Sequence, residues 1–239
     1  MTQAIILASA IGPAALLLWY FHSRDRFPEP TPIVIRTAAW GCFATLPAIG
    51  IGLVLEPIGQ RLGDPIAAAA FGAFVQAGLV EELCKLAVLL GYAMRHSAFD
   101  EPMDGLVYGA AAALGFAGLE NLLYVQSAEG DWAEIAMIRG LTAVPQHAID
   151  GAMMGFFCGL AHFDPTHRAA HLWKAWLVPA TFHGLYDWPL FVLQARGEVE
   201  DPASPMVVAW LAVLGGGALY ARHLLKRVRH SQHAQAVSA

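Results

Sequence analysis

Long apolar stretches alternate with short polar breaks along the whole chain. A helix needs about 20 apolar residues to cross a bilayer, and seven stretches approach or exceed that length. The breaks between them contain Pro, Gly, Asp and Ser, as in FPEPTP, EPIGQRLGDP and HFDPTHR, which is typical of turns. We therefore predict an all-α fold, a polytopic transmembrane helical bundle of about seven spans. The predicted spans are residues 4–21, 33–55, 66–94, 104–126, 136–161, 173–194 and 206–222.

The composition supports a membrane protein. Of the 239 residues, 57% are hydrophobic and 14% are charged, whereas a soluble domain has about 25% charged residues. This length suits one compact bundle, so we expect a single integral membrane domain over residues 1–239. No basic segment precedes the first apolar stretch and no clear cleavage site follows it, so we interpret it as an uncleaved span.

Basic residues in the short loops predict the orientation, because cytoplasmic loops are enriched in Lys and Arg. In a seven-span arrangement most of them share one side, which we assign to the cytoplasm together with the C-terminus. The N-terminus is then outside, on the side of the acidic loops with Glu129, Glu198, Glu200 and Asp201. We expect the basic tail RHLLKRVRH to anchor this topology and not to bind nucleic acid. The cytoplasmic set is Arg24, Arg26, Arg95, Arg168, Lys174, Arg222, Lys226, Arg227 and Arg229, and the opposite set is Arg61 and Arg196, with Arg139 near a span start.

The third predicted span contains Glu81, Glu82 and Lys85 within an apolar stretch. Each such charge costs roughly 2.5–3.5 kcal/mol at the bilayer centre, while an apolar residue contributes only about 0.3–0.6 kcal/mol. The three charges therefore need partners in a protein-lined cavity, which makes them a candidate site. Glu81 and Lys85 share a helix face and can pair. Glu82 points about 100° away and would stay unpaired within the helix.

Three further predicted spans carry ionisable residues. These are Glu120 with Asn121 and Phe116, His147 with Asp150 just after Pro145, and His183 with Asp187 between Pro179 and Pro189. Each group alone could be a structural pair or a satisfied core residue. Polar residues in spans mostly face the bundle interior, so four helices with such groups predict one shared cavity. At about 1.5 Å per residue, Glu81 and His183 fall near mid-bilayer, and Glu120, His147 and Asp187 fall in the outer half.

Four short motifs follow one another in these spans. They read EELCK (81–85), FAGLE (116–120) with Asn121 after it, HAIDG (147–151) and HGLYD (183–187), and the segment DRFPEP (25–30) follows the first span. This order resembles the PrsW family of intramembrane proteases, whose motifs include EExxK, FxxxE followed by Asn, and two later histidine motifs. The resemblance covers roughly residues 20–190. The family is distantly related to CAAX-processing and bacteriocin-processing membrane proteases.

The resemblance implies a multi-pass protease of the bacterial cytoplasmic (inner) membrane. Its expected partners are a membrane-anchored protein or peptide substrate and the lipid bilayer, and no nucleic acid. The founding members of the family clip membrane-anchored anti-sigma factors on their extracytoplasmic side. A catalytic-type core is then expected at about residues 33–194, with peripheral spans at 4–21 and 206–222.

Peptide hydrolysis needs an activated water, a group that stabilises the oxyanion and a proton donor for the leaving amine. The sequence has no GxSxG or HExxH motif, and Cys84 has no histidine near it in the chain, so a glutamate acting on water fits better. We predict Glu81 as general base, with Glu120 or His147 holding the water. His183, held by Asp187, would stabilise the oxyanion, and Glu82 would orient a partner helix or share a proton. The predicted catalytic set is Glu81, Glu82, Glu120, His147, His183 and Asp187, supported by Lys85, Phe116, Asn121 and Asp150.

Three alternatives stay open at this point. In a metal-dependent intramembrane protease, Glu81, Glu120, His147 and His183, and also Glu82, offer N and O ligands for Zn²⁺. No close two-histidine motif is present, so we favour the metal-free glutamic-type protease and expect no cofactor, with a divalent metal such as Zn²⁺ as the alternative. A small proton-coupled carrier would also place Glu, His and Lys in spans, but the chain has an odd predicted span number and no inverted repeat. A non-catalytic membrane scaffold would leave Glu81→Gln without effect.

Overall fold

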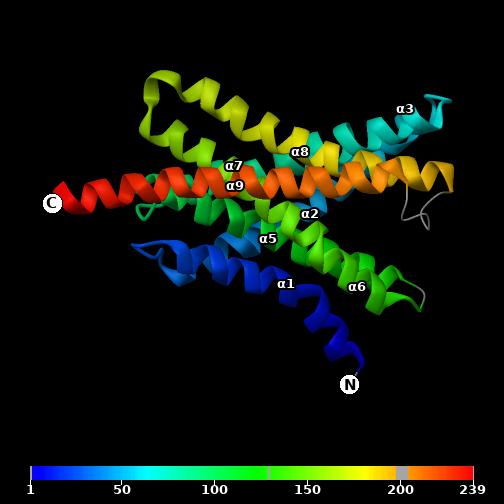
Figure 1. The fold of residues 1–239 in the computed structure, drawn as a ribbon, viewed down its shortest axis with the longest axis horizontal. Coiled ribbons are helices and arrows are strands. Elements are labelled where there is room, and N and C mark those ends of the chain that lie inside the picture. Colours follow the sequence, from blue (N-terminus) through cyan, green and yellow to red (C-terminus); the bar gives the residue numbers. More distant parts are fainter. Residues whose placement is uncertain (1, 129, 198–203, 239) are drawn as a thin grey trace.

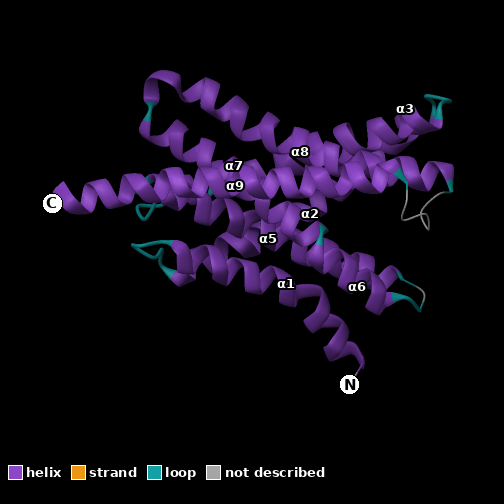
Figure 2. Cartoon of the chain, in the orientation of Figure 1, coloured by secondary structure: helices purple, strands orange, loops and turns teal. Residues whose placement is uncertain are grey.

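The computed structural model describes residues 2–128, 130–197 and 204–238, and within them the regular structure is helical, without a strand (Figures 1 and 2). The predicted acidic residues Glu129, Glu198, Glu200 and Asp201 lie outside the described residues. In chain order the elements are α1 (Thr2–Arg24), α2 (Thr31–Gln60), α3 (Pro65–Ala70), the π-helix η1 (Phe71–Glu81), α4 (Glu82–Gly91), the 3₁₀-helix η2 (Ala93–Arg95), α5 (Pro102–Ser127), α6 (Trp132–Leu141), α7 (Ala143–Phe163), the 3₁₀-helix η3 (Pro165–His167), α8 (Arg168–Arg196) and α9 (Pro205–Ser238).

The prediction of an all-helical protein is confirmed, and every predicted span contains helix. Within the described residues, four helices are long and apolar enough to cross a membrane: Gln3–Arg24, Thr31–Gln60, Pro102–Ser127 and Pro205–His230. The other predicted spans are divided into shorter helices or carry ionisable side chains, which lowers their apolar character. The count of seven spans and the orientation of the termini therefore remain predictions.

The helices run back and forth along the long axis of the molecule (Figure 1). The turns between α1 and α2 and between α7 and α8 lie at the end of the molecule that holds the C-terminus. The turns between α2 and α3 and between α5 and α6 lie at the other end, nearer the N-terminus. This alternation is the arrangement that the predicted topology requires.

The centre of the bundle is the contact between α5 and α7. Most of both helices is buried, and small residues let their backbones approach closely. A Cβ atom on Gly109 or Gly155 would collide with backbone atoms of the facing helix. In a bilayer, where lipid is as apolar as the side chains, such close packing supplies much of the association energy. The close α5–α7 contact therefore fixes the relative positions of residues on these two helices.

The predicted third span changes helix type between its two glutamates. Phe71–Glu81 winds as a π-helix, and the α-helical winding resumes at Glu82. Two side chains tie η1 to its neighbours: Gln76 Nε2 donates to the Gly52 carbonyl at 3.1 Å, and Trp176 Nε1 donates to the Leu79 carbonyl at 2.9 Å. π-helical turns are rare and often occur at functional sites. Here the transition separates Glu81 from Glu82.

The prediction of one continuous helix over residues 136–161 is wrong. The chain breaks at Thr142, whose φ of −129° and ψ of −64° end α6 before α7 begins. Pro145 therefore lies in the first turn of α7, where a missing N–H costs no helical hydrogen bond. The helix over this span is therefore interrupted, and α6 is a short separate helix that packs on α1.

Candidate active site

One polar cavity of about 1090 Å³ opens between the helices. Its wall includes five of the six predicted catalytic residues: Glu81, Glu120, His147, His183 and Asp187. They come from η1, α5, α7 and α8. The sixth, Glu82, is fully buried behind this wall. The structure thus brings the residues of all four motifs together, as the sequence predicted for one shared cavity.

Lys85 is the buried cation at the centre of the cluster. Its Nζ donates to Glu82 Oε1 at 2.7 Å and to Glu81 Oε2 at 3.4 Å. Nζ also lies 2.9 Å from His147 Nδ1 and 4.3 Å from the centroid of the Phe116 ring. The expectation that Glu82 stays unpaired within its helix is wrong, because residues three apart are also neighbours on a helix.

His183 lies between two carboxylates. Its Nδ1 is 2.7 Å from Glu82 Oε1, and its Nε2 is 3.2 Å from Asp187 Oδ2. The i,i+4 pair expected from the sequence is therefore present. The partners on both sides fix the orientation of the ring, and Nδ1–H can donate to Glu82 while Nε2 faces the cavity side.

Glu120 and His147 form a second pair. His147 Nε2 lies 2.9 Å from Glu120 Oε2, and the Arg139 Nη2 donates to the same oxygen at 2.9 Å. An ammonium group has no lone pair, so Lys85 must donate to His147 Nδ1. The proton of a neutral His147 is then on Nε2, which donates to Glu120. A continuous hydrogen-bonded chain follows from Arg139 through Glu120, His147, Lys85, Glu82 and His183 to Asp187.

The predicted supporting residues have different surroundings. Phe116 places its ring under Lys85. Asn121 is fully buried and accepts from Arg139 Nε at 3.1 Å while its Nδ2 donates to the Ala10 carbonyl of α1 at 2.8 Å. Asp150 is fully buried, accepts two bonds from Gln146 Nε2 at 3.0 and 3.1 Å, and does not line the cavity.

Within the described residues, three sets of side chains place possible metal ligands within 4.8 Å of one another; Asp25, Glu101 and Asp104 lie outside this cluster, and the other two sets belong to it. One is Glu81, His147 and His183, which faces the cavity, and the other is Glu82, Asp150 and His183, which is buried. The donor types suit Zn²⁺. His183 fits well through Nε2, because Nδ1–H can donate to Glu82 as metal-bound histidines usually do to a carboxylate. His147 fits less well, because binding through Nε2 would move its proton to Nδ1, against the Lys85 ammonium.

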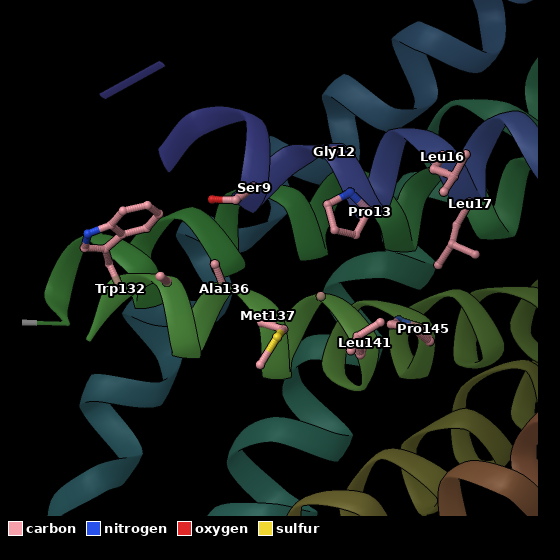
Figure 3. Close-up of a pocket in the computed structure, with 12 residues that line it drawn as sticks. Ser9, Gly12, Pro13, Leu16, Leu17, Trp132, Ala136, Met137, Leu141 and Pro145 are labelled. Carbon is pink, nitrogen blue, oxygen red and sulfur yellow. The ribbon is translucent and has the colours of Figure 1, made fainter. Parts of the chain in front are cut away.

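A second, apolar groove lies on the far side of α6 (Figure 3). It has a volume of about 620 Å³ and runs between α1 and α6, with Pro13 and Leu17 on one wall and Met137 and Leu141 on the other. Its lining contains no ionisable side chain. It therefore has no groups for acid–base chemistry, and the candidate site is the polar cavity.

Two residues of the cluster were missed in the sequence. Arg139 was counted only as a loop charge that reports orientation, although it lies inside a predicted apolar span. The cost of a charge in a span, which singled out Glu81, applies equally to Arg139 and could have identified it. Gln146 carries no charge, and its contact with Asp150 has no signal beyond the i,i+4 spacing.

Comparison with known proteins assigns the family. The profile described as PrsW family intramembrane metalloprotease matches residues 29–215. The chain is 36% identical over 193 residues to Protease PrsW of Geobacillus kaustophilus (strain HTA426), covering 80% of this chain and 82% of that protein. It is 37% identical over 190 residues to Protease PrsW of Bacillus subtilis (strain 168), covering 79% and 84%. No solved structure gives a significant match. The chain therefore belongs to the PrsW family of intramembrane proteases.

Proposed function

We propose that this protein is an endopeptidase that hydrolyses membrane-anchored protein substrates in the polar cavity, with Glu81 activating the attacking water without a metal. The observation that carries the proposal is the position of Glu81. Its nearest polar contact, 3.4 Å to Lys85 Nζ, is longer than the nearest contact of any other carboxylate in the cluster. Its next contact is 3.9 Å to His183 Nε2, and it faces the cavity. Membership of a protease family favours peptide hydrolysis over a carrier or a scaffold.

The other glutamates are less suited to act as base. A general base needs a free lone pair within reach of the water. Glu82 has a fully buried side chain, and its Oε1 already accepts from Lys85 and His183. Glu120 Oε2 accepts from Arg139 and His147. The Glu81 side chain is 16% exposed, so water can reach it, and it differs from the similarly exposed Glu120 (17%) because its nearest donor, Lys85 Nζ, is 3.4 Å away.

The expected reaction assigns a role to each of the predicted catalytic residues and to Lys85. Glu81 takes a proton from water as the water oxygen attacks the peptide carbonyl carbon. His183 acts here in its doubly protonated form: Nδ1–H stays on Glu82, and the Nε2 proton, oriented by Asp187, stabilises the developing oxyanion. Glu81 then passes its proton to the leaving nitrogen as the C–N bond breaks. Glu120 holds the water, His147 fixes Glu120 through its Nε2 proton, and Lys85 keeps Glu82 and the two histidines in place.

The family description names a metalloprotease, so the metal-dependent alternative needs a direct test. Glu81, His147 and His183 would hold the ion. A divalent metal supplies a Lewis acid and lowers the pKa of a bound water. The Lys85–His147 contact supports the metal-free proposal. Lys85 occupies the lone pair on His147 Nδ1, and a metal bound through Nε2 would force the ring proton onto Nδ1, against the Lys85 ammonium. A metal at this site would require Lys85 to move or lose its proton.

The substrate segment has to fit an apolar wall. Phe116, Leu190, Phe191 and Trp210 line the cavity beside the ionisable cluster. This lining suits the apolar side chains at the edge of a membrane span. We propose a membrane-anchored protein as substrate, cleaved in the manner of site-1 cleavage of an anti-sigma factor. The proposed location is the bacterial cytoplasmic membrane, with the N-terminus outside and residues 33–194 forming the catalytic core of one domain.

Cleavage of a tagged panel of membrane-anchored peptides by purified protein in detergent tests this function. Glu81→Gln keeps the shape of the side chain but removes the base, so the rate should fall by about 10²–10⁴-fold. Glu56→Gln is the matched control, because Glu56 lines the same cavity outside the cluster. Cleavage that survives in Glu81→Gln would contradict the assignment of the base. A folded wild-type protein that cleaves no peptide, in detergent or in native membranes, would contradict the function.

A further inference from the structure

Arg139 has no part in the reaction described above, yet it is one of the most heavily engaged side chains near the cavity. Its Nη2 donates to Glu120 Oε2 at 2.9 Å, and its Nε donates to Asn121 Oδ1 at 3.1 Å. The guanidinium also lies 3.7 Å from the centroid of the Tyr124 ring. These three partners lie within five residues of α5, so Arg139 clamps one face of that helix from α6.

This clamp acts directly on the active-site carboxylate. Arg139 and His147 contact the same oxygen of Glu120, each at 2.9 Å. The position of that oxygen therefore determines where His147 can direct its Nε2 proton. Glu120 has 17% of its side chain exposed to the cavity. Without the guanidinium, the carboxylate could turn toward the cavity and release His147.

We propose that Arg139 is a positioning residue, which sets Glu120 and, through it, His147, so that the catalytic cluster is assembled only when α6 is seated against α5. The inference rests on the proposed function of the same cavity. Arg139 is suited to the role because its planar fork reaches two acceptors at once, which a lysine cannot do in the same geometry.

The seating of α6 depends on contacts away from the cavity. Ala136 packs with Ala10 and Val125, and Gly140 faces Pro13 of α1. The helix is short and is separated from α7 by the break at Thr142. Ala136 and Gly140 also line the apolar groove between α1 and α6, next to Met137 and Leu141 (Figure 3). A displacement of α6 from α1 would therefore carry Arg139 away from Glu120.

Steady-state cleavage by single and double variants tests the inference. Arg139→Gln should lower kcat by about 10- to 100-fold with little change in KM, as expected for loss of a group that orients catalytic residues. Arg139→Lys, which keeps the charge but loses the fork, should recover part of kcat. Because Arg139 acts through Glu120, Arg139→Gln combined with Glu120→Gln should be no slower than Glu120→Gln alone. Arg196→Gln, at an exposed position on α8, is the control and should match the wild type.

Three kinetic results would overturn the proposal: an unchanged kcat in Arg139→Gln, effects that multiply in the double variant, or a change confined to KM. A readout without substrate separates this inference from the proposed function. In protein with ¹⁵N-labelled histidine, the His147 ring signals, assigned through His147→Gln, should shift in Arg139→Gln and stay in place in Arg196→Gln. Unshifted His147 signals in a folded Arg139→Gln protein would refute the positioning role even if no substrate is found.

Discussion

At the scale of single residues, one buried cation, Lys85, contacts several groups of the cluster. Lys85 contacts Glu81, Glu82, His147 and the ring of Phe116, and its side chain is fully buried. Removing the cation leaves the Glu82 carboxylate buried, with the hydrogen bond to His183 Nδ1 still in place but without the Lys85 ammonium. Breaking one side of a buried ion pair is far more costly than losing a surface pair.

Lys85→Met should therefore destabilise the fold by about 3–5 kcal/mol. Thermal unfolding of the purified protein in detergent measures this change. Lys174→Met, at an exposed position on α8, should change stability little. Equal unfolding temperatures for the two variants would show that Lys85 has no structural role in the cluster.

A second residue-scale prediction concerns the loop between α1 and α2. Glu29 is 6% exposed and accepts a hydrogen bond from the Tyr108 hydroxyl. Burial raises the pKa of Glu29, the bond from Tyr108 partly opposes this rise, and the charge of Asp25 adds to it. Because folding raises this pKa, the folded state loses stability as the pH rises through it and Glu29 must ionise in a buried place.

Glu29→Gln cannot ionise and keeps an acceptor for Tyr108, so it should unfold at a higher temperature than the wild type at neutral pH. At acidic pH, where the wild-type carboxyl carries its proton, the two proteins should unfold at similar temperatures. Unfolding temperatures measured across this pH range, with the exposed Glu134→Gln as control, test whether Glu29→Gln is the more stable protein at neutral pH. A lower unfolding temperature for Glu29→Gln at neutral pH would contradict it.

At the scale of helices, the sequence predicted where helix occurs better than how each helix is wound. The apolar stretches and their turn residues located the long helices, but not α6 as a separate helix or η3, which lies in a predicted turn. The π-helix before Glu82 and the break at Thr142 were not predicted. Gly72, Gly78 and Gly140 lie in or near them, but glycines occur throughout the spans and do not by themselves mark a change of winding, which tertiary packing decides. The helical spacing correctly predicted the pair of His183 and Asp187. The 2.7 Å pair between Glu82 and Lys85 was not predicted, because only the i,i+4 neighbour Glu81 was paired with Lys85.

Gly140 provides a test of how α6 is seated. A Cβ at this position would lie 3.0 Å from Pro13 Cγ, so Gly140→Val should push α6 away from α1. If the proposed role of Arg139 holds, cleavage should fall by about 10-fold or more although no polar group has changed. Gly215→Val is the matched control, because a Cβ there meets nothing within 4 Å. Equal activity in the two variants would show that catalysis does not depend on how α6 packs against α1.

At the scale of the molecule, the motifs predicted which residues share a cavity but not the full network around them. Polar residues of spans mostly face the interior of a bundle, and this rule correctly predicted that residues of four helices share one cavity. Arg139 was missed because its charge had been used to predict orientation. The side of the membrane that each turn occupies also remains a prediction, since it rests on the distribution of Lys and Arg.

Single cysteines test that orientation. In a variant without Cys42, Cys84 and Cys158, Ser97→Cys and Ser127→Cys place thiols at exposed positions in turns predicted to lie on opposite sides. A membrane-impermeant thiol reagent applied to intact cells should label Ser127→Cys and not Ser97→Cys. The reverse labelling would invert the topology, and labelling of both would contradict the predicted number of crossings between them.

The most direct test of the central claim is cleavage of one defined membrane-anchored peptide after treatment with 1,10-phenanthroline. Wild-type protein and Glu81→Gln are compared, with bound metal measured in the same samples. The account predicts that the wild type cleaves at an unchanged rate after chelation and that Glu81→Gln stays inactive whether or not Zn²⁺ is added. Loss of wild-type cleavage on chelation, restored by Zn²⁺, would contradict it and assign Glu81, His147 and His183 to a metal centre.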